Sequence, residues 1–454
     1  MDALDRRLRE LMDAAVGEPP RPISLTAVRR RVIRRRRAEY VTGAAAVAAL
    51  AIAAVLIPLG IGTLRIGTPR HAAGPDGRYG PAGGASVYAA YNLFNAAGTK
   101  SLGNVVFPIN AAHNRAEYPV NVGDGPIYSP GGQIAVTPNG KTAYVVNTGA
   151  GTIIPISTAD NRAGKPIYIG RCRTFGPDFI AITPNGKTAY VADLCTNTVT
   201  PVSTASNTAG QPIDVGQGPI WIAITPDGRT AYVANESHPG TITPVSTATN
   251  TAGRPIHVTN DPFDIAITPD GKTAYVLSRS AGIPTRSVLT PINTATNTPG
   301  QRIYLNGLGG DGFIAITPDG KTAYVSTGHP SSVVPVSTTT NTAGKPIELA
   351  RPDNPGGGQI VITPDGRTAY VLAGTYTVHP ISTASNVAGP PINLQSDCQD
   401  ELGSAQAAMA ITPDGKTVYV ACQGAVVPIS TATNLAGKPI RVTLGYPMAM
   451  AARP

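Results

Sequence analysis

Short apolar segments recur along most of the chain, and each is followed by the same turn-forming residues. In one of them, Ile222, Ala223 and Ile224 place no polar residue on either alternate face, which is typical of a strand buried on both sides. The sequence Thr-Pro-Asp-Gly follows and suits a type I turn, with Pro at its second position and Gly at its fourth. The next residues, Thr-Ala-Tyr-Val, have the composition of a second strand, so the pattern predicts a hairpin.

Two further strands complete the predicted unit. After a variable loop, residues 241–245 are expected to form a third strand, and Ser-Thr-Ala-Thr-Asn-Thr-Ala-Gly turns the chain into a fourth at residues 254–258. Pro255 lacks a backbone N–H and therefore marks the fourth as an edge strand. The predicted unit is a four-stranded antiparallel sheet.

The unit returns seven times, and this repetition predicts the fold class. The Thr that ends each first strand is found at Thr137, Thr183, Thr225, Thr268, Thr317, Thr363 and Thr412. The intervals are 46, 42, 43, 49, 46 and 49 residues, which is the range of a propeller blade. We therefore predict an all-β fold, a β-propeller of four-stranded antiparallel blades.

The two ends of the repeat region predict how the ring closes. Residues 86–123 contain a second, third and fourth strand but no first, whereas residues 447–451 match residues 408–412 in pattern and would supply it. Pairing of the N- and C-terminal strands would remove the exposed edges of an open array. Seven units and this composite unit predict eight blades. Seven blades is the alternative, in which residues 86–123 lie outside the ring.

Two of the repeats contain a sequence known from other proteins. Tyr144–Asn147 has the sequence Tyr-Val-Val-Asn, and Tyr232–Asn235 has Tyr-Val-Ala-Asn. With these near copies of the signature, residues 86–452 resemble the YVTN-type β-propeller family of bacterial and archaeal surface proteins. The resemblance implies a propeller of the cell surface. It implies no activity, because the family has no common set of catalytic residues.

Charge is concentrated ahead of the repeats and predicts a membrane topology. Residues 1–40 contain 11 Arg against 6 acidic residues, so they supply +5 of the formal +9. Seven of these Arg lie between Arg29 and Arg37, directly before the uncharged stretch Tyr40–Leu64. A membrane-spanning helix needs about 20 apolar residues, and basic residues stay on the cytoplasmic side. We therefore predict a single-pass protein of the cytoplasmic membrane, with its N-terminus inside and the propeller extracellular.

The predicted domains follow from this topology. Residues 1–39 form a basic cytoplasmic leader with a short amphipathic helix, residues 40–64 a transmembrane signal anchor, residues 65–85 a linker rich in Gly and Pro, and residues 86–454 the propeller. A cleavable secretory signal and a buried core helix are the alternatives for residues 40–64. Membrane topology explains the Arg cluster, so we expect no nucleic-acid partner.

The four cysteines stand at equivalent places in two repeat units. Cys172 and Cys398 precede a first strand, and Cys195 and Cys422 follow the second strand of the same unit. A hairpin returns the chain to the end at which it began, so each pair is expected to lie together at one rim of a blade. We predict disulfides Cys172–Cys195 and Cys398–Cys422, which agree with an oxidising extracytoplasmic location. Free buried thiols are the alternative.

Candidate binding residues gather where the first strands begin. The position four before the repeated Thr lies near the mouth of the central channel, and the loops there vary most in length, which is typical of a binding face. With two acidic residues of adjoining loops, these positions form the predicted ligand site: Gln133, Asp178, Phe179, Trp221, Asp264, Asp311, Phe313 and Gln359. Ordinary packing at the blade tops is the alternative interpretation.

Other patterns have simpler explanations. His238 and His329 each precede a Pro in corresponding loops, but two blades separate them, so exposed loop histidines are favoured over metal ligands. Gly307–Gly312 fits G-x-G-x-x-G, but no helix is expected after it, which removes the phosphate-binding rationale. The Tyr of each second strand is assigned to packing between blades. The sequence contains no Gly-x-Ser-x-Gly, His-Glu-x-x-His, haem-attachment Cys-x-x-Cys-His or Walker motif, and we expect no metal or cofactor.

These observations favour a binding module. We expect a membrane-anchored cell-surface propeller that binds a surface protein, a cell-wall component or a small ligand through its loops. An extracytoplasmic enzyme of lactonase or oxidoreductase type is the main alternative, and it requires acidic side chains such as Asp178, Asp264 and Asp311 to converge at the channel mouth. A transmembrane sensor is a second alternative, with the propeller coupled to the helix at residues 2–16.

Overall fold

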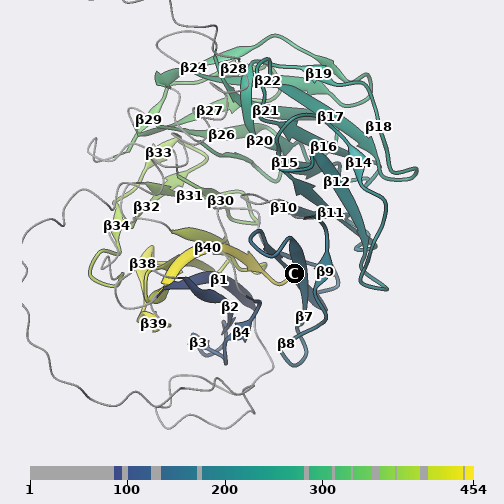
Figure 1. Ribbon diagram of the computed structural model, residues 1–454. Coiled ribbons are helices and arrows are strands. Elements are labelled where there is room, and N and C mark those ends of the chain that lie inside the picture. Colours follow the sequence, from purple (N-terminus) through teal and green to yellow (C-terminus); the bar gives the residue numbers. More distant parts are fainter. Residues whose placement is uncertain are drawn as a thin grey trace, which may run out of the picture. The chain divides into compact units, whose positions relative to one another are not determined.

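The computed structural model describes residues 86–94, 101–123, 134–170, 176–280, 286–308, 312–328, 331–349, 358–373, 376–398, 407–442 and 445–454. All of them belong to one of two compact units of the chain, that of Pro69–Glu401 and Ala405–Pro454. These described residues form strands and connecting turns without a helix, and the strands make eight antiparallel sheets (Figure 1). The fold is an all-β propeller of eight blades, as predicted.

Every blade is built in the same order from the inside outward, and we number the blades 1 to 8. The innermost strands are, in that order, β40 (Gly445–Ala452), β5 (Ile134–Val136), β10 (Pro177–Ile182), β15 (Pro219–Ile224), β20 (Asn260–Ile267), β25 (Ile314–Ile316), β30 (Ile360–Ile362) and β35 (Ala408–Ile411). The second strands are β1 (Val87–Phe94), β6 (Thr142–Asn147), β11 (Thr188–Asp193), β16 (Thr230–Asn235), β21 (Thr273–Arg279), β26 (Thr322–Thr327), β31 (Thr368–Ala373) and β36 (Thr417–Cys422).

The outer half of each blade consists of a third strand and two short strands that both pair with it. The third strands are β2 (Ser101–Asn110), β7 (Thr152–Ser157), β12 (Thr198–Ser203), β17 (Thr241–Ser246), β22 (Arg286–Asn293), β27 (Ser332–Ser337), β32 (Thr377–Ser382) and β37 (Ala425–Ser430). The short pairs are β3 (Arg115–Ala116) with β4 (Val120–Asn121), β8 (Arg162–Ala163) with β9 (Ile167–Tyr168), β13 (Thr208–Ala209) with β14 (Ile213–Asp214), β18 (Thr251–Ala252) with β19 (Ile256–His257), β23 (Thr298–Pro299) with β24 (Ile303–Leu308), β28 (Thr342–Ala343) with β29 (Ile347–Glu348), β33 (Val387–Ala388) with β34 (Ile392–Asn393), and β38 (Leu435–Ala436) with β39 (Ile440–Arg441).

The outer edge corrects the prediction of one continuous fourth strand. In blade 4, Gly253, Arg254 and Pro255 interrupt the edge between β18 and β19. Gly253 donates its N–H to Pro244 O at 2.7 Å, and a Cβ on Gly253 would lie 3.2 Å from Pro244 Cγ. Pro255 then has no N–H to offer. The predicted strand at residues 254–258 was wrong in its extent, although its place at the edge of the sheet is confirmed.

The Thr-Pro-Asp-Gly turn has the predicted geometry. Gly228 donates its N–H to Thr225 O at 2.8 Å and has a φ of +71°, a left-handed value that favours glycine. The Thr225 hydroxyl donates to Asp227 Oδ1 at 2.6 Å and accepts the N–H of Thr230 at 3.1 Å. The turn thus satisfies its own polar groups, which explains why its sequence changes so little between blades.

The inner strands close a ring. They contact one another in the order β40, β5, β10, β15, β20, β25, β30, β35 and back to β40. β40 pairs antiparallel with β1, beside which it lies in Figure 1. Residues 86–123 and the C-terminal strand therefore share blade 1, and the prediction of eight blades with one composite blade is confirmed.

The C-terminal strand is shifted by two residues from its predicted alignment. Ala451 stands opposite Tyr88, as Ala410 stands opposite Tyr419, so that Ala451 rather than Ala449 corresponds to Ala410. Side chains alternate between the two faces of a strand, so a shift of two residues leaves the same faces inward. The hydrophobic pattern alone therefore matched both alignments.

A tyrosine of every second strand links its blade to the next. Tyr232 donates its hydroxyl to Asn297 Oδ1 at 2.6 Å, and Asn297 has a left-handed φ of +56°. The same pair forms at all eight junctions: Tyr88–Asn161, Tyr144–Asn207, Tyr190–Asn250, Tyr232–Asn297, Tyr275–Asn341, Tyr324–Asn386, Tyr370–Asn434 and Tyr419–Asn114. Burial raises the pKa of Tyr232 to about 12, so its hydroxyl keeps its proton at neutral pH. The assignment of these tyrosines to contacts between blades is confirmed.

The hydrophobic core consists of eight layers, one between each pair of neighbouring blades. Between blades 4 and 5, for example, Tyr232 and Ala234 of β16 pack against Ile265 and Val276 of the next blade, and all four are buried. Each sheet therefore buries both of its faces, which is why the three residues before each repeated Thr are apolar.

No helix among the described residues is both long and apolar enough to cross a membrane. Residues 1–39, 40–64 and 65–85, the predicted leader, anchor and linker, lie outside the described residues. The membrane topology therefore stays a prediction.

Candidate ligand site on the loop face

The propeller has two faces with different chain segments. β15 begins at Pro219 and ends at Ile224, directly before its Thr-Pro-Asp-Gly turn. We call the side of these turns the hairpin face. The opposite side, where inner strands begin and second strands end, is the loop face. Those predicted ligand residues and cysteines that the structure describes belong to the loop face.

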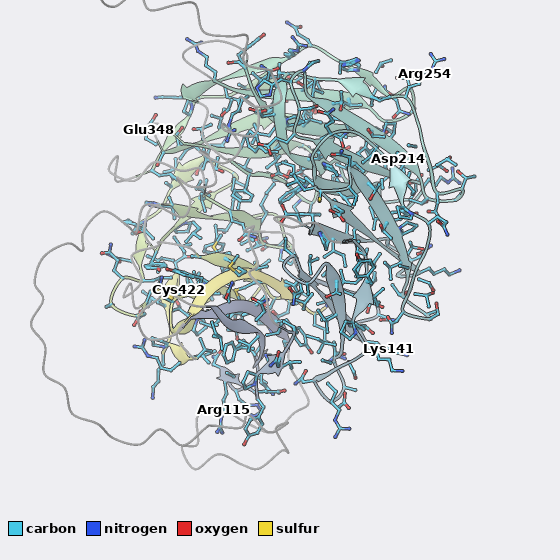
Figure 2. All side chains as sticks on the ribbon, viewed as in Figure 1. Arg115, Lys141, Asp214, Arg254, Glu348 and Cys422 are labelled. Atoms are coloured by element: carbon cyan, nitrogen blue, oxygen red, sulfur yellow. A yellow bond between two sulfur atoms is a disulfide. The ribbon has the colours of Figure 1, made fainter. Side chains whose placement is uncertain are left out.

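A disulfide fixes the loop face at blade 8. Cys398, ahead of β35, is bonded to Cys422, the last residue of β36, with their Cα atoms 5.6 Å apart (Figure 2 labels Cys422). This pair is the predicted one. The Tyr91 hydroxyl of blade 1 donates to Cys422 O at 3.0 Å, so the disulfide lies where the ring closes. Cys195 is also disulfide-bonded, but its predicted partner Cys172 lies outside the described residues, and that pairing stays a prediction.

Three aromatic rings of the predicted site come together, although they belong to three blades. The ring centroids of Phe179 in β10 and Trp221 in β15 lie 4.3 Å apart, with the ring planes inclined by 39°. Trp221 also meets Phe313, which precedes β25, edge-on at 6.4 Å. Trp221 of blade 4 therefore reaches past blade 5 to blade 6. All three side chains are partly exposed, and we call them the aromatic group.

Asp264 occupies the same repeat position in blade 5, between the blades of Trp221 and Phe313. Its side chain is 3% exposed, and its Oδ2 accepts the N–H of Ile314 in blade 6 at 2.8 Å. The N–H of Ile265 donates to the same carboxyl group. Burial raises the pKa of Asp264 from 3.8 to about 7, and the two N–H donors offset only part of this rise. The carboxyl group therefore changes its charge near neutral pH.

Gln359 makes the same contact with an uncharged side chain. Its Oε1 accepts the N–H of Met409 at 2.7 Å, which joins blade 7 to blade 8 as Asp264 joins blade 5 to blade 6. Both side chains hold neighbouring inner strands together. Their arrangement agrees with the packing alternative for this part of the predicted site.

The other predicted residues are Asp178, Gln133 and Asp311. Asp178 is 7% exposed and lies at an irregularity of β10, where the register with β11 shifts. Gln133 and Asp311 lie outside the described residues. Within the described ranges, no three side chains of His, Cys, Asp or Glu are arranged to hold a metal ion. In the G-x-G-x-x-G match, Gly307 and Leu308 end β24, residues 309–311 lie outside the described residues, and Gly312 is followed by strand β25 rather than by a helix.

Sequence reasoning missed a buried acid beside His238. The side chain of His238 is 56% exposed, as expected for a loop histidine, but its Nδ1 lies 3.1 Å from Asp261 Oδ1. Asp261 is 4% exposed, and an Arg279 nitrogen lies 3.8 Å from its Oδ2. Arg279 also stacks over Phe263, 5.4 Å from the ring centroid. One sequence signal could have indicated this contact. Asp261 and Phe263 alternate as strand residues do, and β20 does extend through them toward the loop face. His329 lies outside the described residues.

Comparison with known proteins identifies a fold. No family model matches the chain, and no curated protein matches it. A hydrazine synthase from Kuenenia stuttgartiensis is similar with a TM-score of 0.52 and 19% identity, over 70% of this chain and 97% of that one. The dihydro-heme d1 dehydrogenase NirN, in complex with DHE, has a TM-score of 0.62 and 13% identity, over 82% and 76%. A functionally unknown protein from Desulfotomaculum acetoxidans has a TM-score of 0.52 and 18% identity, over 69% and 98%.

Identities this low show the fold alone. The YVTN-type resemblance is supported by no family model and stays a prediction. What the comparisons and the strand order establish together is that residues 86–454 include an eight-bladed β-propeller.

Proposed function

We propose that the chain is a membrane-anchored cell-surface binding module that takes its ligand on the loop face, around Trp221. The observation that carries the proposal is the aromatic group, whose three rings come from three blades and remain partly exposed. The chain has six Phe and one Trp, and three of these seven residues gather here. The recurring tyrosines, in contrast, serve the contacts between blades. This concentration of rings at the inner strands supports a binding role.

The chemistry of the aromatic group favours a ligand whose ring has one apolar face and polar groups around its rim. Binding sites are lined mainly by apolar and aromatic side chains, with a few polar groups that fix the orientation of the ligand. The rings of Phe179 and Trp221 are partly exposed, and the loop ahead of β15 contains the exposed polar side chain of Gln217. A sugar ring has an apolar C–H face and a rim of hydroxyl groups, which suits this combination. Among the expected partners, we therefore favour a glycan of the cell wall.

The carboxyl groups of the site give less support to an enzyme. A pKa of about 7 would suit Asp264 to proton transfer, but the side chain is 3% exposed and accepts two backbone N–H groups. Gln359 makes the equivalent contact without a titratable group. A structural role accounts for both residues, so a binding function is preferred.

Trp221 is the only tryptophan of the chain, so its fluorescence reports on the site directly. The full chain in detergent is titrated with a soluble disaccharide-peptide fragment of peptidoglycan. We expect a saturable emission change, with affinity lowered about tenfold in Phe179→Leu and in Phe313→Leu, both of which keep Trp221. Tyr304→Ser is the matched control, because Tyr304 is an aromatic residue of the outer edge, 57% exposed. Absence of saturable binding to this fragment and to whole cell-wall sacculi would contradict the proposal.

A further inference from the structure

The hairpin face has a cation in each of the seven repeated turns, and in five blades a carboxylate neutralises it. These ion pairs, with their N···O distances, are Arg229–Asp227 (3.8 Å), Lys272–Asp270 (3.5 Å), Lys321–Asp319 (3.8 Å), Arg367–Asp365 (3.8 Å) and Lys416–Asp414 (3.5 Å). Exposed pairs of this kind add little stability. They do, however, leave the turns of blades 4 to 8 without net charge.

Blades 2 and 3 keep the turn but lose the carboxylate. Asn139 Oδ1 accepts the Thr137 hydroxyl at 2.7 Å and the N–H of Lys141 at 3.0 Å, the contacts that Asp makes elsewhere. Asn185 accepts the N–H of Lys187 at 2.9 Å in the same way. Both lysine side chains are exposed, and neither has a carboxylate partner among the described residues (Figure 2 labels Lys141). Substitution of Asp by Asn therefore preserves the turn and uncovers one positive charge in each blade.

Blade 1 adds a third unpaired cation beside them. Arg453 follows β40, and its N–H donates to Ser86 O at 2.7 Å. Its side chain lies against the turn of blade 2, because a Cβ on Gly140 would be 2.9 Å from Arg453 Nε. In the described part of the chain, its guanidinium has no carboxylate partner either. Three consecutive blades thus present Arg453, Lys141 and Lys187, which we call the basic sector.

The loop face has the opposite charge. Its described residues carry eight carboxyl groups and three arginines: Asp178, Asp193, Asp214, Glu236, Asp261, Asp264, Glu348 and Asp397, with Arg279, Arg286 and Arg441. The propeller is therefore electrically polar along its axis, with the basic sector at the positive end. Near an anionic surface, such a charge distribution orients a protein with its positive face toward that surface.

The first described residue of the propeller, Ser86, lies on the hairpin face. Ser86 precedes β1, donates its N–H to Ile109 O at 2.8 Å and accepts the N–H of Arg453. It therefore lies at the hairpin-face end of β1, beside the basic sector. The predicted linker at residues 65–85 has 21 residues. A flexible chain of that length spans about 25 Å on average, which permits either face to turn toward a membrane. Charge then selects the orientation.

We propose that the basic sector rests on the anionic phospholipid headgroups of the membrane that holds the chain, so that the loop face and Trp221 point away from it. This inference rests on the membrane anchor of the proposed function. A lipid surface fits the basic sector better than one small anion does, because its three cations stand on separate blades of an open face. A fluid layer of headgroups meets all three at once.

The test measures which face lies nearer to the lipid. The full chain is reconstituted into phosphatidylcholine vesicles with or without phosphatidylglycerol, and a donor dye is attached to an introduced cysteine. Ala205→Cys labels an exposed turn of the hairpin face in blade 3, and Gln217→Cys labels an exposed loop between blades 3 and 4 on the other face. Energy transfer to an acceptor on the headgroups should be about twofold higher from residue 205 in anionic vesicles, and this difference should vanish at high salt and in neutral vesicles.

Charge variants show whether the orientation on the vesicle depends on the basic sector or only on the net charge of the protein. The triple variant Lys141→Gln, Lys187→Gln and Arg453→Gln should abolish the difference between the two labels. The matched control removes three exposed cations of the outer edge and should preserve it: Lys165→Gln, Lys345→Gln and Lys438→Gln. Equal effects of the two triple variants, or a shorter distance from residue 217 to the lipid, would overturn the proposal. Release of the chain from the vesicles by carbonate would instead refute the anchor itself, and this inference with it. Unchanged thermal melting verifies that each variant is folded.

Discussion

The hydroxyl of Tyr419 donates a hydrogen bond to Asn114 Oδ1 at 2.6 Å, although the two residues are 305 positions apart. This bond joins blade 8 to blade 1 and completes a circle of eight equivalent Tyr–Asn bonds. Asn114 has a φ of +46°, a left-handed conformation that asparagine adopts more readily than most residues. Asn114 therefore has two roles: it adopts the left-handed conformation of its own turn, and it accepts the hydrogen bond from the neighbouring blade.

Replacing Tyr419 by Phe removes this hydroxyl without changing the ring packing. We expect the free energy of unfolding to fall by about 1 kcal/mol, the typical net contribution of one hydrogen bond. A double-mutant cycle with Asn114→Gly, which keeps the left-handed φ, should give a coupling energy of about 1 kcal/mol in denaturant titrations. Tyr168→Phe is the control, since Tyr168 is 63% exposed at an outer edge. Strictly additive losses in the cycle would show that the two side chains do not interact.

Deletion of residues 447–454 tests the composite blade. The deletion removes most of β40, uncovers one edge of β1 and empties part of two core layers, to which Ala449 and Met450 contribute. We expect the melting midpoint to fall by more than about 10 °C and the transition to broaden, as measured by circular dichroism. Deletion of the exposed Pro454 alone is the control. A truncated protein that melts like the intact one would contradict ring closure by β40.

His379 gives the propeller a sensitivity to acid. It lies in β32, is 2% exposed, and its Nε2 has no hydrogen-bond partner in the described residues. Burial lowers the pKa of His379 from 6.5. As pH falls below about 6.5, the unfolded chain therefore binds the proton first, and stability is lost.

His379→Val should remove this loss and raise the free energy of unfolding at pH 6 by about 1–2 kcal/mol, because no polar atom is then buried without a partner. Val334 and Val427 occupy the same place in blades 6 and 8, so valine fits the site. Denaturant titrations from pH 5 to pH 8 measure the effect. His257→Gln, at an exposed position, is the matched control. An unaltered pH profile in His379→Val would show that another group titrates.

For the carboxyl group of Asp264 we expect the opposite dependence of stability on pH. Its pKa is raised to about 7 in the folded protein from 3.8, so the folded state holds a proton over this interval and stability falls as pH rises through it. Asp264→Asn keeps an acceptor for the N–H of Ile314 but has no charge to bury. Above pH 7 the free energy of unfolding should increase, by at most about 4 kcal/mol.

The reciprocal variant Gln359→Glu should lose stability above pH 7, because it places an acid at the equivalent contact. Asp214→Asn, at an exposed position, is the control. Thermal melting at pH 5 and pH 8 distinguishes the outcomes. A destabilised Asp264→Asn at pH 8 would mean that the charged carboxylate is required there.

The repeat period was sufficient to predict the ring, because each unit must bury both faces of its sheet and can do so only against copies of itself. Cys398 and Cys422 were predictable for a related reason, since a hairpin returns the chain to the same rim. The asparagine partner of Tyr419 was missed because Asn is common in turns for its own conformational preference, which concealed its second role. Contacts such as Trp221 with Phe313, or His238 with Asp261, depend on side-chain directions and loop paths that no period determines.

The pairing of Val87 with Ala452 has a consequence for the order of folding. The outer strands of blade 1 are synthesised before all other blades, yet its innermost strand is synthesised after all of them. Until then the earlier blades form a linear stack with an open end, in which units unfold nearly independently. Arrival of the last strand converts the stack into a cooperative whole, and because this step joins the most distant segments of the chain, it is expected to be slow.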